Sequence, residues 1–422
     1  MNQAYFTFCC SGKGKSVSGL GGDRARAAVK GTSEHELTVF KPYCSFPQYS
    51  SSSKTVFNPE TAANAVSMAK LVYSPVGANE SSQRFLAHSV YALPDKETLR
   101  DGNYFSHLIY PLPDAWSIRT ALEMWRSPFW VTQDSGEISS QLPPVDENNI
   151  PFGIINENSF VEFLRSTPER QKKFLFLLKS FLTLNPNGKI VLTGYPEDMA
   201  FCLWGITRIL PPPMWRYISF STLEKPTLSC SFDVVNFLMP EKPESQDEFI
   251  FSELSKRQNV LFYSENPVFP SSAIPDIPLA NEILEISVNG KFRLLDEFYQ
   301  TVPVTWRKSS AALQLFWKFI NRPKQITCND ISGALKIQEL KSQAIQTLMD
   351  NSRFSLDEQL EFYSLLDAQR QDALLNRLIS ENSIEQIRNN EKYSKLLASA
   401  LSIPEKSNVP DKKPSLFQRF FR

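Results

Sequence analysis

The sequence has no excess of either charge. Its 45 lysines and arginines balance 45 aspartates and glutamates over 422 residues. A nucleic-acid backbone or an anionic membrane attracts proteins through an excess of positive charge, and this chain has no global field of that kind. We therefore expect no nucleic-acid binding, since such binding would have to come from a local basic patch.

Long apolar runs and regularly spaced cysteines are also missing. No run approaches the roughly 20 apolar residues that cross a bilayer, and the chain does not open on a basic, then apolar, then small-residue leader. The six cysteines include no C-x-x-C pair, which argues against a disulfide framework and a zinc knuckle. We expect a cytoplasmic protein with reduced, mostly buried thiols and no membrane span.

The opening stretch lacks one glycine of a phosphate-binding loop. Residues 9–16 read CCSGKGKS, and the pattern G-x-x-x-x-G-K-[ST] needs glycine where Cys9 stands. The following VSGLGG is too rich in glycine to begin the helix whose amides would face a phosphate. We interpret residues 11–16 as a turn after a strand, and direct nucleotide binding is the weakest of our three functional hypotheses.

Histidines are scarce: the chain has His35, His88 and His107. Two of them with a cysteine would suit metal ligation or a cysteine nucleophile with a histidine base, but no spacing fixes them together. The alternative is that His88 lies on a strand face and His107 bonds backbone in a turn. The carboxylates show no informative pairing, and we predict no metal site and no cofactor.

The pattern that is present indicates a multidomain α+β and α/β protein. Residues 1–140 alternate apolar strand runs with helical segments, which predicts an α+β N-terminal domain in which Asp114 caps a helix over 115–125. The polar, proline-bearing stretch 132–151 marks a domain boundary.

Residues 150–275 alternate helix and strand patterns, such as the buried-strand run KIVLTGY at 189–195. This alternation predicts an α/β middle domain with a mixed sheet, and the two neighbouring strands around 215–238 indicate an antiparallel element. Beyond about residue 278 little reads as strand, and SLDE at 355–358 and SIEQ at 383–386 are capping boxes. We predict an all-α C-terminal bundle over 280–402 and a flexible tail over 403–422.

The segment LRDGNYFSHLIY at 99–110 is the most unusual candidate site. Arg100, Gly102, Asn103 and His107 fall within eight residues, ahead of apolar positions. They either hold a turn rigid while His107 caps the next strand, or they line a ligand site. The second possibility gives our alternative function, an enzyme of unrecognised class with a pocket around Arg100, Asn103 and His107.

Two segments carry a resemblance to a known family. Residues 99–107 resemble the R-x-G-N-x-x-x-H block in the N-terminal domain of bacterial GTPase-associated proteins. Residues 209–222, ILPPPMWRYISFST, are similar to that family's middle region, where a helix ends in leucine-proline and a strand carries S-F-S-T. The opening YFTFCCSGKGKSVSG looks like the family's first strand and turn. The additional motif positions in the middle segment are Arg216, Ser219 and Ser221.

The resemblance, which extends over roughly residues 1–240, implies an adaptor or regulator. Such proteins are encoded beside a small GTPase in bacterial conflict systems, so the implied partners are a small GTPase and other proteins of an anti-phage (antiviral) defence system. The family offers no established catalytic residues, and the matching residues carry over as motif positions alone. Our first hypothesis is therefore a non-enzymatic protein that acts through protein-protein interaction.

Overall fold

The computed structural model describes residues 1–9, 22–47, 69–74, 84–91, 104–133, 141–183, 188–229, 231–237, 245–307, 309–350 and 352–401. The chain divides into two compact units, Met1–Ser310 and Ala311–Arg422. We call the first the sheet unit and the second the helical unit.

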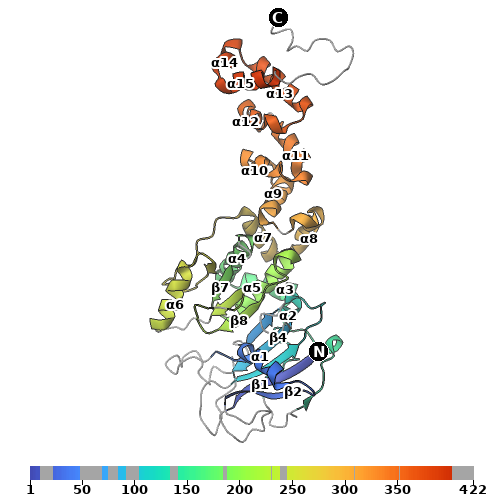
Figure 1. Ribbon diagram of the computed structural model, residues 1–422, viewed down its shortest axis with the longest axis vertical. Coiled ribbons are helices and arrows are strands. Elements are labelled where there is room, and N and C mark those ends of the chain that lie inside the picture. Colours follow the sequence, from blue (N-terminus) through green and yellow to red (C-terminus); the bar gives the residue numbers. More distant parts are fainter. Residues whose placement is uncertain are drawn as a thin grey trace. The chain divides into compact units, whose positions relative to one another are not determined.

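The sheet unit is built on one ten-stranded sheet with the strand order β10-β7-β9-β8-β3-β4-β5-β1-β2-β6 (Figure 1). The strands are β1 Asn2–Cys9, β2 Gly22–Val29, β3 Lys70–Ser74, β4 Phe85–Tyr91, β5 Tyr104–Tyr110, β6 Gln141–Leu142, β7 Lys189–Thr193, β8 Phe220–Glu224, β9 Val234–Phe237 and β10 Val260–Phe262.

The sheet has an antiparallel half and a parallel half. Strands β3, β4, β5, β1 and β2 pair antiparallel, and β10, β7, β9 and β8 pair parallel. The halves meet where β3 and β8 pair antiparallel, with Val72 opposite Ser221. At this seam the backbone N–H of Leu71 donates to Thr222 Oγ1 (2.8 Å), and the fully buried Lys70 pairs with Glu224 (2.7 Å).

Helices cover both faces of the sheet. On one face α1 (Glu34–Cys44) and α6 (Ser245–Lys256) bury Phe40 and Phe251 in a core that includes Val191. Because side chains alternate along a strand, Ile190 and Leu192 point to the opposite face. There α2 to α5 pack on one another, and α5 packs against β8. These helices are α2 Ile118–Glu123, α3 Glu157–Ser166, α4 Pro168–Thr183 and α5 Pro196–Ile209, and α7 Pro278–Val288 and α8 Phe292–Thr301 follow them.

Two local predictions are wrong. Strands β8 and β9 are parallel, because Ser219 and Asp233 join their starts: the Ser219 N–H and hydroxyl both donate to Asp233 Oδ2 (2.8 and 2.7 Å). The cap of α2 is Ser117, whose hydroxyl accepts from the Thr120 N–H in a capping box. Asp114 lies earlier and pairs with Arg84 (3.2 Å).

The helical unit contains α-helices and short connections over its described residues. Its helices, the first of which starts at the last residue of the sheet unit, are α9 Ser310–Asn321, α10 Cys328–Ala334, α11 Gln338–Leu348, α12 Leu356–Leu360, α13 Ala368–Glu381, α14 Ile384–Asn389 and α15 Glu391–Leu401. The packed pairs are neighbours in sequence: α10 with α11, α12 with α13, and α14 with α15. Both predicted capping boxes are confirmed, at Ser355 and Ser383.

The predicted fold class, mixed α and β with a helical C-terminal region, is confirmed. The predicted boundary within 132–151 lies between segments that contribute strands to the same sheet. The domain ranges 1–140, 150–275 and 280–402 stay predictions, and the tail 403–422 lies outside the described residues. Among the helices of the described chain, none combines the length and the apolar character needed to cross a membrane.

Candidate functional site

The carboxyl ends of the parallel strands bring polar side chains together at one edge of the sheet. Strands β10, β7, β9 and β8 run in the same direction, so all four end at this edge. In open α/β sheets ligands bind at the carboxyl ends of the strands. This edge is therefore where a site is expected on physical grounds.

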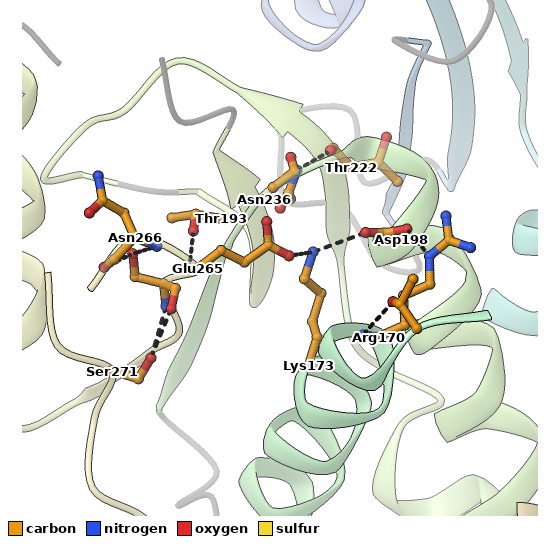
Figure 2. Close-up of polar contacts among 12 residues, drawn as sticks. Arg170, Lys173, Thr193, Asp198, Thr222, Asn236, Glu265, Asn266 and Ser271 are labelled. Atoms are coloured by element: carbon orange, nitrogen blue, oxygen red, sulfur yellow. Dashed lines mark hydrogen bonds and ion pairs between the residues drawn. The ribbon is translucent and has the colours of Figure 1, made fainter. Parts of the chain in front are cut away.

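A buried lysine lies at the centre of the edge. Lys173 of α4 is 1% exposed in its side chain, and its Nζ lies 2.5 Å from Glu265 Oε1 and 3.2 Å from Asp198 Oδ2 (Figure 2). Asp198 comes from the first turn of α5, which follows β7, and Glu265 comes from the segment after β10. Three segments far apart in sequence thus meet on one ammonium group.

Arg170 completes what we call the Lys173 cluster, which consists of Arg170, Lys173, Asp198 and Glu265. Arg170 lies one helical turn before Lys173 and donates from Nε to Asp198 Oδ1 (3.0 Å). Its guanidinium stacks over the Phe163 ring at 4.6 Å from the centroid. Asp198 therefore has a cation on each of its carboxylate oxygens, and the cluster contains two positive and two negative charges.

Gly194 makes room for the lysine. It follows β7 with φ +128°, a conformation that favours glycine, and a Cβ added there would lie 2.5 Å from Lys173 Nζ. Hydrogen bonds hold the loop that carries Glu265. Among them, the Glu265 N–H donates to Thr193 Oγ1 (3.3 Å), the Ser264 N–H to Ser271 Oγ (3.0 Å), and the Asn266 N–H to Ser264 Oγ (3.1 Å). Backbone geometry therefore fixes the cluster from two sides.

The electrostatics keep the lysine charged. Burial by itself lowers the pKa of Lys173, but attraction by Asp198 and Glu265 outweighs burial, and the pKa lies above its usual value. Burial raises the pKa of the neighbouring Cys202 thiol, and burial together with the Glu265 charge raises the pKa of Tyr263 to about 12. Lys173 is thus an anchor for anions rather than a nucleophile or a base.

His107, a predicted site residue, lies in the antiparallel half with both ring nitrogens hydrogen-bonded. The Val131 N–H donates to its Nδ1 (3.2 Å), so Nε2 carries the proton and donates to Gln3 Oε1 (3.0 Å). The ring is 1% exposed and stacks on Phe129. Burial is the main cause that lowers the pKa of His107 to about 3, and the nearby His88 is the second. This geometry does not present His107 as a general acid or base near neutral pH.

The two strand histidines lie together, as a shared site would need. His88 and His107 are directly opposite in the β4–β5 register, and His88 stacks on Trp130 with ring centroids 5.1 Å apart. Burial lowers the pKa of His88 to about 3, and its buried Nδ1 has no hydrogen-bond partner among the residues that the structure describes. In the described part of the chain, no three His, Cys, Asp or Glu side chains gather as metal ligands. The pair is packed against aromatic rings.

The predicted motif positions of the middle segment support the sheet, with one exception. Ser219 binds Asp233, as described above, and Ser221 Oγ donates to Glu224 Oε1 (2.8 Å). Arg216 is exposed and stacks over Tyr217 at 4.4 Å. Strand β8 is separated from β5 by β3 and β4, so Ser221 and His107 lie about 14 Å apart by strand spacing. The two motif segments therefore do not form one site.

The remaining predicted positions, Arg100, Gly102 and Asn103, and the loop 11–16 lie outside the described residues. Sequence reasoning missed the Lys173 cluster. A signal was present, because Lys173 falls on the same helical stripe as Phe176 and Leu177, at positions i, i+3 and i+4. A lysine on an apolar stripe needs a buried partner, but nothing local indicates which carboxylates supply it.

Comparison with known proteins adds no family: no family model matches the chain, and no curated protein matches it.

Proposed function

We propose that the protein is a non-enzymatic adaptor or regulator that works in the bacterial cytoplasm with a small GTPase and other anti-phage defence proteins. The partner class comes from the resemblance of residues 99–107 and 209–222 to GTPase-associated proteins. The helical unit supports an interaction role, because its helices pack in pairs of sequence neighbours, and arrays of such pairs offer extended binding surfaces in repeat proteins.

The proposal depends on which motif residues are buried and which are exposed. His107, Ser219 and Ser221 are buried and hydrogen-bonded within the sheet. Arg216 belongs to the same motif segment as Ser219 and Ser221, yet it is exposed and stacks on Tyr217, which is 64% exposed. Arginine and tyrosine are enriched among the residues that dominate the affinity of protein interfaces. A motif that builds a rigid scaffold and presents an Arg–Tyr pair suits partner binding.

Capture of the GTPase from the native host tests the proposal. The full-length chain is expected to co-purify with a GTPase encoded next to it, and Arg216→Glu is expected to weaken that binding at least about tenfold, or 1.4 kcal/mol. Arg293→Glu is the matched control, because Arg293 is also exposed and its ion pair with Glu297 lies within α8. Repeated native pull-downs that recover no GTPase would overturn the proposal.

A further inference from the structure

The partners of Lys173 differ in their access to solvent. Asp198 is 9% exposed in its side chain and is also bound by Arg170, whereas the Glu265 side chain is 38% exposed. Glu265 is therefore the partner that can leave Lys173 without entering an apolar region. An anion arriving from solvent would meet Lys173 at the position that the Glu265 carboxylate occupies.

A second side chain at this edge has an unused hydrogen-bonding group. Asn236 of β9 is fully buried, and its Nδ2 donates to the carbonyl oxygens of Gly194 (2.8 Å) and Thr222 (3.0 Å). These two bonds fix the orientation of the amide, and among the described residues its buried Oδ1 has no hydrogen-bond partner. Buried acceptors without donors are rare in folded proteins, so this oxygen is available to a further donor.

Both groups belong to the same small region. Gly194, whose carbonyl accepts from Asn236, is also the residue whose missing Cβ admits Lys173 Nζ. Figure 2 shows Asn236 beside the line formed by Glu265, Lys173 and Asp198. The region lies at the carboxyl ends of β7 and β9, the edge at which α/β sheets bind ligands.

We propose that this edge binds a small molecule that carries a carboxylate or phosphate group next to a hydrogen-bond donor. The anion replaces the Glu265 carboxylate on Lys173, and the donor, a hydroxyl or N–H, binds Asn236 Oδ1. Exchange of one carboxylate for an external monoanion keeps the charge balance of the Lys173 cluster. This inference goes beyond the adaptor function and does not depend on it.

Glu265 acts as an internal competitor in this arrangement. A group tethered beside its partner has an effective concentration in the millimolar range or above, so external anions bind the native protein weakly. Removal of the Glu265 charge while the side-chain shape is kept should therefore strengthen anion binding. The same removal leaves the pair between Lys173 and Asp198 in place.

Titration calorimetry of the full-length chain with acetate, glycolate and inorganic phosphate tests the proposal. Glu265→Gln is expected to bind these anions at least about tenfold more tightly than the native chain, and glycolate, which adds a hydroxyl donor, more tightly than acetate. Glu253→Gln is the control, because the Glu253 side chain is 40% exposed and pairs with Lys256 at 3.1 Å on the surface. Its anion affinity should equal that of the native chain.

Two affinity results would overturn the proposal: a folded Glu265→Gln chain with native anion affinity, or binding that Glu253→Gln strengthens equally. The position of the bound anion is checked in ¹H–¹⁵N spectra of the Glu265→Gln chain, where the amide signals of Gly194 and residue 265 should shift when anion is added. Shifts confined to other residues would also contradict it. If circular dichroism shows that the Lys173→Met chain folds, this variant should not bind the anions. If it does not fold, the ¹H–¹⁵N spectra of the Glu265→Gln chain give the location instead.

Discussion

The buried histidines of the antiparallel half and the buried Lys173 of the parallel half have opposite charge states. In the antiparallel half, burial lowers the pKa values of His88 and His107 to about 3, so both rings are neutral at pH 7. In the parallel half, Lys173 is equally buried but remains charged, because Asp198 and Glu265 lie within 3.2 Å of its ammonium. Burial therefore neutralises a basic group unless opposite charges are placed beside it.

The two groups also differ in their access to solvent. The histidines pack against Phe129 and Trp130 and are at most 4% exposed. The Lys173 cluster reaches solvent through Glu265. A neutral, aromatic-packed pair stabilises the sheet, whereas a charged group with one exchangeable partner offers binding chemistry.

Removal of the lysine charge should have the largest effect. Lys173→Met leaves Asp198 and Glu265 without their shared cation, and loss of one partner from a buried ion pair costs about 3–5 kcal/mol of unfolding free energy. Urea unfolding at pH 7 measures this loss. The double variant with Lys173→Met and Asp198→Asn should regain part of the lost unfolding free energy.

A matched lysine lies on the same helix. Lys179 pairs with Asp276 at 2.9 Å, and that carboxylate is 73% exposed in its side chain. Lys179→Met should therefore cost far less unfolding free energy than Lys173→Met, because exposed ion pairs contribute little to stability. Equal losses from the two variants would contradict the contrast between a buried and an exposed pair.

Local pattern was enough to predict many elements of the sheet unit. The buried-strand run predicted at 189–195 contains β7, and the apolar runs of β4, β5 and β10 have the same character. Pro196 with two acidic residues begins α5, which is a typical helix start. The order of the strands was not predictable in this way. Pairing of β3 with β8 joins residues about 150 positions apart, which no local period encodes.

The same limit explains what was missed at the site. Asp198 lies 25 residues from Lys173, and Glu265 lies further still. Their meeting depends on β7 lying between β10 and β9. His107 was singled out because its segment is unusual, yet the decisive facts are tertiary: Gln3 and Val131 occupy its two nitrogens.

Acid should destabilise the antiparallel half through its histidines. Both rings are neutral when folded, with pKa values of about 3, whereas unfolded histidine titrates near 6.5. Between these values the unfolded chain binds more protons, so unfolding free energy falls as pH falls below about 6.5, by about 1.4 kcal/mol per pH unit for each histidine. Urea unfolding at pH 7, 6 and 5 measures the slope.

A single-histidine variant isolates this contribution. His88→Phe removes a ring whose Nδ1 has no partner among the described residues, so it should fold well and lose about half of the histidine contribution to the slope. Comparison with the native slope also removes the contribution of the carboxylates, which titrate in both chains. An unchanged slope in His88→Phe would show that the buried ring does not titrate on unfolding.

A further comparison takes one glycine from each half. Gly194→Ala in the parallel half combines backbone strain at φ +128° with a Cβ 2.5 Å from Lys173 Nζ, and should cost about 2–3 kcal/mol. Gly31→Ala, after β2, has φ +94° and no atom within 4 Å of the new Cβ, so strain alone should cost about 1 kcal/mol. Thermal or urea unfolding gives both values. Lys173→Met should bring the Gly194→Ala cost down toward that of Gly31→Ala, because the crowding is directed at the ammonium. If the Gly194→Ala cost does not depend on Lys173, the backbone rather than the lysine requires glycine there.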